Sequence, residues 1–265
     1  MNVHHAITDP VLLRRDHEGV AWLTLNRPAA RNALSVALMT ALQAELAAIE
    51  TDPAVKVVVI GGAGPAFCAG HDLREMRAEP RREAYEALFA QCSELMLAIG
   101  RLPKPVIARV HGIATAAGCQ LVATCDLAVA ADTARFATPG VNIGLFCSTP
   151  MVALSRAVGR KAALEMLLTG DMMDAAHAQA IGLINRVVPP ERLDDEIRTL
   201  ARHLASKLGL AVAIGKEAFY RQAEMGLDDA YTYTGAVMTR NMLARETEEG
   251  IDAFLAKRPP PWQAH

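Results

Sequence analysis

The stretch that decides the fold runs from Pro105 to Asp126 and reads PVIARVHGIATAAGCQLVATCD. It begins with a β-branched run at Val106, which is typical of a strand, and turns at His111-Gly112. Very small residues fill positions 115–119, and an apolar helical pattern resumes at Leu121. A strand that leads through such a turn into a helix presents unpaired N–H groups, which favour negative charge. The same small residues could serve only close packing of helix on strand, so both interpretations stand at this point.

A second segment, Phe67 to Asp72 (FCAGHD), has the same design. It follows the continuous apolar run VVVI at 57–60, which is typical of a strand covered on both faces. If the two junctions lie side by side, one backbone N–H from each would converge on a single oxygen. Such a pair is an oxyanion hole, and it suits a thioester carbonyl that passes to an enolate.

Composition places the chain among ordinary globular proteins. Its 265 residues can bury a core as one large or two small domains, with 52% hydrophobic but only 5% aromatic residues. A net charge of -2 gives no basic surface for nucleic acid. Five widely spaced cysteines without a C-x-x-C pair indicate a reduced protein rather than a disulfide framework or a zinc site, so no metal is expected.

The N-terminal residues and the hydropathy pattern lead to a prediction of location. The opening MNVHHAITDP has neither a signal-peptide pattern nor an Arg- and Ser-rich amphipathic pattern. No apolar run reaches the ~18 residues of a membrane span. We therefore expect a cytoplasmic protein without membrane partners.

The order of elements predicts an α/β core with parallel strands. Two strands around a turn at 17–19 precede a helix that Ser35 can cap, and strands alternate with helices up to Pro150. From Arg192 the pattern is nearly all helical, with breaks near Gly209, Gly226 and Gly250. The division expected is a core at 1–192 and a helical region at 193–265.

The ordered set of motifs resembles the enoyl-CoA hydratase/isomerase, or crotonase, family over almost the whole chain. Each motif alone is weak, but their order and spacing are specific. The motifs are LNRP at 25–28 with NAL at 32–34, FCAGHDL at 67–73, KPVIA at 104–108, AGCQL at 117–121, CD at 125–126, RAVG at 156–159, LTG at 168–170 and AIGL at 180–183.

This resemblance implies a spiral of ββα turns with a C-terminal helical region that forms a homotrimer or homohexamer. It implies an acyl-CoA thioester as substrate or ligand, no further cofactor, and an oxyanion hole made of the N–H groups of His71 and Ala117. Lys257 matches a lysine that reaches the CoA phosphates from a neighbouring subunit. The CoA-binding positions it implies are Ala29, Arg31, Ala66, Ala69, His71, Asp72, Leu73, Gly118 and Lys257.

At two positions the chain departs from the pattern of a hydratase, which uses two glutamates to add water. Gln120 stands at the first and Gly140 at the second. Glutamine cannot accept a proton from water and glycine has no side chain, so hydration should be weaker by orders of magnitude. One subgroup, the enoyl-CoA hydratase domain-containing proteins, is similar in this region and lacks the same acids.

Three functional hypotheses remain open. The chain could act on an acyl-CoA thioester through an enolate, as in isomerisation, hydrolysis or decarboxylation, or it could be a non-catalytic acyl-CoA-binding or regulatory protein. A serine-peptidase relative is the weakest, because no Ser/His/Asp set stands at the matching turns. Of the single side chains, the His71 imidazole is a weak acid–base candidate, Asp72 is better explained as a helix cap, and Cys119 and Cys147 as inert pocket lining.

Overall fold

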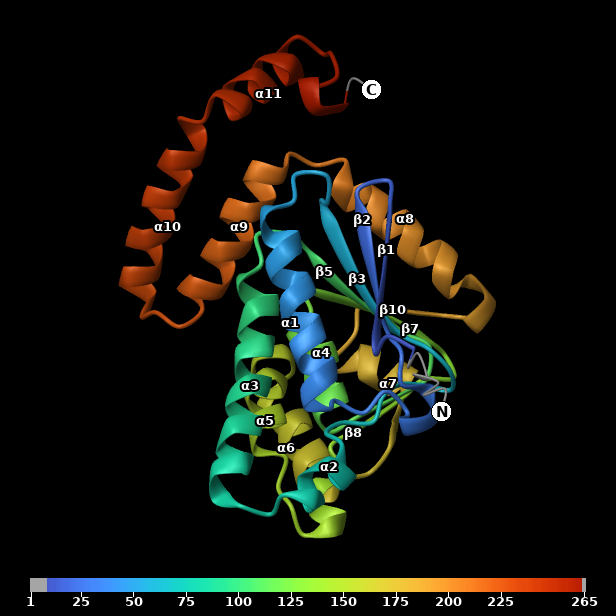
Figure 1. Cartoon of the computed structure of the whole chain (residues 1–265). Coiled ribbons are helices and arrows are strands. Elements are labelled where there is room, and N and C mark those ends of the chain that lie inside the picture. Colours follow the sequence, from blue (N-terminus) through green and yellow to red (C-terminus); the bar gives the residue numbers. More distant parts are fainter. Residues whose placement is uncertain (1–8, 264–265) are drawn as a thin grey trace.

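A six-stranded sheet forms the centre of the computed structural model, which describes residues 9–263 (Figure 1). β1 (Leu12–His17) and β2 (Val20–Leu25) form an antiparallel hairpin, and β2 pairs in parallel with β3. The remaining pairs are parallel. The other strands, in the order in which they lie across the sheet, are β3 (Val57–Gly62), β5 (Val106–Val110), β7 (Leu127–Ala131) and β10 (Arg186–Val188).

The strands of a smaller four-stranded sheet follow strands of the large sheet along the chain. It contains β4 (Ala66–Cys68), β6 (Ile113–Thr115), β8 (Arg135–Ala137) and β9 (Met173–Asp174). β4 follows β3, β6 follows β5 and β8 follows β7, and helices come after the short strands. This strand–strand–helix repeat is the ββα spiral that the family resemblance implies, so the fold class is confirmed.

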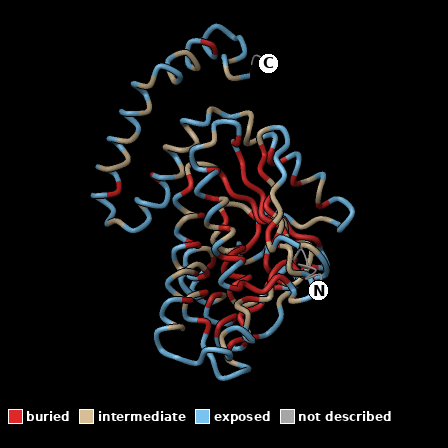
Figure 2. Tube along the Cα trace, viewed as in Figure 1, coloured by how far each residue is buried: buried red, intermediate tan, exposed pale blue. Residues whose placement is uncertain are grey.

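Helices cover both faces of the large sheet, as the buried residues in Figure 2 indicate. α1 (Val36–Thr51) begins at the predicted cap, where the Ser35 hydroxyl accepts a hydrogen bond from Leu38 N at 3.2 Å. α1, α3 (Arg82–Arg101) and α4 (Ala117–Thr124) pack on one face, and α8 (Leu193–Ala205) packs on the other through Leu193, Ile197 and Leu200. None of the helices in residues 9–263 is long and apolar enough to cross a membrane.

The last helices form an arm, which we define as α9 to α11. α9 lies against α3 of the core, and α10 and α11 extend away from it (Figure 1). The division at residue 193 stays a prediction, and α8 itself lies on the sheet. The remaining elements are η1 (Pro28–Ala30), α2 (Leu73–Ala78), η2 (Pro139–Ile143), α5 (Ser148–Ala157), α6 (Arg160–Thr169), α7 (Ala175–Ala180), η3 (Pro190–Arg192), α9 (Gly209–Gln222), α10 (Leu227–Met242), α11 (Arg245–Leu255) and η4 (Pro261–Gln263).

One of the breaks expected in this region is wrong. Gly209 and Gly226 stand at the starts of α9 and α10, but Gly250 lies inside α11. Its role is packing, because a Cβ at Gly250 would collide with the indole of Trp262. The glycine lets the C-terminal segment fold back onto α11.

A buried ion pair ties the arm to the core. Lys216 of α9 donates to the carboxylate of Asp126 at 2.6 Å and to the carbonyl oxygens of Ile99 and Lys104 at 3.0 Å each. Asp126 also accepts from Tyr220 Oη at 2.8 Å and from Val106 N at 2.7 Å. The side chain of Lys216 is only 8% exposed, so every member of this network depends on the others for its partners.

Replacing Lys216 by methionine should lower the free energy of unfolding by about 3–5 kcal/mol, because the Asp126 carboxylate would stay buried without its cation. Urea unfolding followed by circular dichroism measures this change. Lys161→Met, at an exposed position on α6, is the matched control and should change stability by less than about 0.5 kcal/mol. Equal stability of the two variants would contradict the assignment.

Candidate functional site

The two small-residue turns singled out in the sequence touch each other. Gly70 has a φ of +94°, a conformation that side chains disfavour. A Cβ on Gly70 would lie 2.9 Å from the Cβ of Ala116 and 3.3 Å from the nitrogen of Ala117. The backbone after β4 therefore runs directly against the start of α4.

A second glycine holds α4 against β4. A Cβ on Gly118 would collide with the carbonyl oxygen of Cys68, so no other residue fits there without moving one of the two backbones. Ala116, just before the helix, has φ 50° and ψ −120°, which is unusual for a residue with a side chain. Strain of this kind typically costs about 1–3 kcal/mol and is common at functional turns.

Two backbone N–H groups at this contact are left without backbone acceptors within residues 9–263. Leu34 pairs with this turn by two hydrogen bonds: Leu34 N donates to Gly70 O at 2.7 Å, and Asp72 N donates to Leu34 O at 3.2 Å. The N–H of His71, which lies between these two residues, takes part in neither bond. Ala117 is the first residue of α4 and has no helical partner for its N–H. Since Gly70 lies against Ala117, the two donors come from touching segments, as an oxyanion hole requires.

The imidazole of His71 is enclosed by apolar groups. Its ring meets that of Phe89 on α3 edge-on, with 5.7 Å between centroids and 76° between planes. Neither ring nitrogen has a hydrogen-bond partner among the described residues, and burial lowers the pKa of the imidazole. The ring is therefore neutral at pH 7, and both of its nitrogens are buried.

Gln120 lies one turn into α4, and its side chain is buried with 4% exposure. Its Oε1 has no partner among the described residues. Buried amide oxygens are nearly always hydrogen-bonded, so this unpartnered oxygen marks a place where a ligand or water can bind.

Gly140 sits in η2 with no room for a side chain. A Cβ there would lie 2.6 Å from the carbonyl oxygen of Leu145 and 2.9 Å from the sulfur of Cys147. The backbone turn is closed by Leu145 N donating to Gly140 O at 2.9 Å. The backbone around Gly140, where the resemblance places the second glutamate of a hydratase, therefore leaves no space for a side chain.

The thiols near these turns are protonated at neutral pH. Burial raises the pKa of Cys119 to about 12 and also raises the pKa of Cys147. A thiol is nucleophilic only as the thiolate, so these side chains act as small apolar groups that line the region. Among residues 9–263 there is also no group of three or more His, Cys, Asp or Glu side chains placed to hold a metal ion.

Asp72 caps α2 as predicted, accepting from Arg74 N at 3.1 Å and Glu75 N at 3.3 Å. Arg27 donates to the same carboxylate at 2.8 Å, and this hydrogen bond lowers the pKa of Asp72. No role for Arg27 was predicted from the sequence, although its place in the LNRP motif could have pointed to one. The pair fixes the loop after β2 to the turn that contains His71.

Asn32 is the second residue whose role the sequence did not reveal. It is fully buried and accepts from Arg27 N at 2.9 Å, while its amide donates to the carbonyl oxygens of Ala63 at 2.8 Å and Ala66 at 2.7 Å. Ala69 N donates to Arg31 O at 3.0 Å. These bonds join the segment of η1 and Arg31, which carries the implied CoA positions Ala29 and Arg31, to the implied positions Ala66 and Ala69.

Lys257 is the one implied CoA-binding residue that a single chain does not bring to this place. It follows α11 at the end of the arm, whereas α2 lies at the opposite end of the molecule (Figure 1). A role for Lys257 thus depends on a second copy of the chain.

Comparison with known proteins agrees with this geometry. Residues 15–265 match the family model described as Enoyl-CoA hydratase/isomerase. The solved structure of an enoyl-CoA hydratase from Mycobacterium smegmatis is similar, with 58% identity, a TM-score of 0.94, and coverage of 97% of this chain and all of that one. Human enoyl-CoA hydratase domain-containing protein 3 is 47% identical over 94% of this chain and 82% of its own length, and its structure superposes with a TM-score of 0.92.

The predicted cytoplasmic location is wrong on this comparison. Similar proteins from Xenopus laevis, rat and human carry mitochondrial in their names. The prediction rested on the N-terminal pattern, and residues 1–8 lie outside the described part of the chain. Within residues 9–263, the folded core has no feature that distinguishes a mitochondrial from a cytoplasmic protein.

The subgroup resemblance also fits, because the enoyl-CoA hydratase domain-containing proteins are among the similar chains. Members of the wider family bind CoA thioesters. With touching turns that offer two free N–H donors, a ββα spiral and a match over residues 15–265, the chain belongs to the enoyl-CoA hydratase/isomerase family.

Proposed function

We propose that this protein binds an acyl-CoA thioester with the carbonyl oxygen between the N–H groups of His71 and Ala117. The observation that carries the proposal is the contact of Gly70 with Ala116 and Ala117, which brings two unused donors from separate turns together. Backbone donors aimed at one oxygen stabilise the charge that develops as a thioester becomes an enolate. The pantetheine and nucleotide of CoA lie along Ala29 to Arg31, Ala66, Ala69 and Leu73, with Gly118 below the thioester.

The same site should hydrate enoyl thioesters poorly. The Gln120 amide can hold a water molecule through hydrogen bonds but cannot take its proton. Gly140 offers no group to protonate C2 when water adds to C3, and its surroundings leave no space for one. Losing general acid–base catalysis typically costs about 10²–10⁴ in rate.

Chemistry that depends mainly on stabilising an enolate is therefore favoured. Decarboxylation forms the enolate by releasing CO2 and needs no proton acceptor, whereas isomerisation or thioester hydrolysis would need a proton acceptor other than Gln120. The unpartnered Oε1 of Gln120 also supports a second candidate, a non-catalytic acyl-CoA-binding or regulatory protein, because a site without a proton acceptor can bind without turnover. Two measurements on the purified protein separate these functions: calorimetric titration with CoA esters and hydration of crotonyl-CoA followed by loss of enoyl absorbance. Binding with hydration at ordinary hydratase rates would overturn the proposal of weak hydration.

Gln120→Glu should increase crotonyl-CoA hydration by at least about 10-fold, because it supplies a proton acceptor at the first position. Burial raises the pKa of a carboxylate, so the gain should grow as the pH rises and the carboxylate ionises. Gln120→Met is the control of similar size and should show no gain. No increase in the glutamate variant, with thioester binding intact by calorimetry, would contradict the assigned position of Gln120.

Gly140→Ala should destabilise the fold by about 1–3 kcal/mol, because its Cβ would lie 2.6 Å from Leu145 O. Gly100→Ala on α3 is the matched control: nothing lies within 4 Å of its Cβ, and it should be neutral or stabilising by up to about 1 kcal/mol. Thermal unfolding measures both. If Gly140→Ala were as stable as the wild type, the closed packing at this position would be refuted.

We further propose that the arm joins copies of this chain into a trimer or hexamer. It exposes several large apolar side chains, including Leu227 at 72%, Tyr231 at 73%, Leu243 at 81% and Phe254 at 81%. Exposed apolar surface of this extent is typical of a protein interface. In such an assembly Lys257 of one copy can approach the CoA phosphates bound to another.

Lys257→Ala should weaken acyl-CoA binding by about 10-fold, the loss of one charge-assisted hydrogen bond to phosphate. Binding of a pantetheine thioester, which lacks the nucleotide phosphates, should not change. Calorimetry with both ligands tests this, and Lys207→Ala, at an exposed position after α8, is the control. An equal loss of affinity for the two ligands would exclude a contact between Lys257 and the CoA phosphates. A monomeric mass by light scattering would exclude a contribution of Lys257 from a neighbouring copy.

A further inference from the structure

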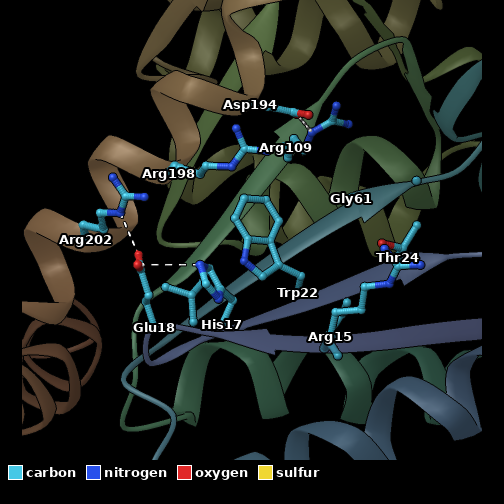
Figure 3. Close-up of a pocket in the computed structure, with 13 residues that line it drawn as sticks. Arg15, His17, Glu18, Trp22, Thr24, Gly61, Arg109, Asp194, Arg198 and Arg202 are labelled. Atoms are coloured by element: carbon cyan, nitrogen blue, oxygen red, sulfur yellow. Dashed lines mark hydrogen bonds and ion pairs between the residues drawn. The ribbon is translucent and has the colours of Figure 1, made fainter.

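A pocket of about 610 Å³ lies on the face of the large sheet that α8 covers (Figure 3). Its walls come from the β1–β2 hairpin, the ends of β3 and β5, and α8. The side chains that the following argument uses are Arg15, Trp22, Thr24, Arg109, Arg198 and Arg202.

Strand register places these side chains together. Arg15 of β1 stands directly opposite Trp22 of β2, so both project to the same face of the sheet. Leu23 and Leu25, which alternate with Trp22 and Thr24, belong to the core on the other face, against α1. The pocket is therefore on the opposite face of β2 from the core cluster that holds Cys68 and Ala117.

The pocket carries a net positive charge. Four arginines line it against two carboxylates, giving +2. Both carboxylates are already paired, Asp194 with Arg109 at 2.5 Å and Glu18 with Arg202 at 2.8 Å. Arg198 has only the exposed Asp195 on its own helix, at 3.0 Å, and Arg15 has no carboxylate within ion-pair distance among residues 9–263.

An aromatic surface stands between three of these arginines. Figure 3 shows the half-buried indole of Trp22 with its ring face toward the viewer, flanked by Arg109 and Arg198 on one side and Arg15 on the other. The stem of Arg109 lies over Gly61, where a Cβ would be 3.5 Å from its Cδ. Indole faces stack on planar rings, and arginine forks bind phosphate with two parallel hydrogen bonds.

We propose that this pocket is a binding site for a nucleoside phosphate, separate from the thioester site. The base would stack on Trp22 and the phosphates would bind Arg15 and Arg198. The volume is in the range of about 300–1,000 Å³ that is typical of small-molecule pockets. The proposal does not depend on the proposed function, because none of these residues belongs to the oxyanion turns.

The chain offers its own reporter for the test. It has two tryptophans, and in a Trp262→Phe background Trp22 is the only one. Titration of this protein with ADP should quench the Trp22 fluorescence to saturation, and adenosine without phosphate should bind at least 10-fold more weakly. The double variant Arg15→Gln/Arg198→Gln should lose at least 10-fold in ADP affinity, while Arg101→Gln, an exposed arginine at the end of α3, should lose none.

A competition experiment separates this pocket from the thioester site. ADP binding should persist with unchanged affinity at saturating acetyl-CoA and should weaken as salt is raised. Displacement of ADP by acetyl-CoA would assign ADP to the CoA site and overturn the proposal, as would the absence of saturable quenching. Equal ADP affinity in the double variant would also overturn it, provided that its thermal unfolding matches that of Arg101→Gln.

Discussion

The close approach of two backbones, after β4 and before α4, is the constraint on which the rest of the structure depends. Gly70 and Gly118 have no side chains to keep the segments apart, and Gly118 rests on the carbonyl of Cys68. Dispersion and hydrogen bonding act at such distances only if nothing bulkier intervenes. β4 and β6, neighbouring strands of the small sheet, each lead into one of these segments, and this contact holds the turn that contains His71 against the start of α4.

Because of this constraint, binding of a carbonyl oxygen and proton transfer depend on different parts of the turns. Oxyanion donors belong to the backbone, so they survive any side-chain substitution that keeps the turns in contact. Proton transfer belongs to side chains, and in the proposed site the two positions that would supply it hold Gln120 and Gly140. Leu145 O and Cys147 Sγ close the space around Gly140, so the local backbone leaves no room for a side chain there.

The sequence predicts those parts of the fold that local chemistry determines. The apolar run at 57–60 predicts a buried parallel strand, and Ser35 predicts the start of a helix. The clusters of small residues predict the two turns that follow β4 and β6. The break expected near Gly250 is wrong because, in the sequence alone, a glycine that makes room for the indole of Trp262 looks the same as a glycine that ends a helix. Arg27 and Asn32 act through partners far along the chain, and the pocket at Trp22 requires β1, β2 and α8 together, so no local pattern shows them.

The groups assigned to the thioester carbonyl share one physical property, since none of them carries a full charge at pH 7. Ala117 offers a backbone dipole, Gln120 an amide, and burial keeps the His71 imidazole neutral by lowering its pKa. Fixed dipoles in a site that excludes water stabilise developing negative charge without reorganising, and they do so at any pH near neutrality. A site of this kind stabilises an enolate but leaves the proton to be moved by the substrate or by water. Under the proposed function, the acyl group itself would therefore decide which reaction follows once its carbonyl is bound.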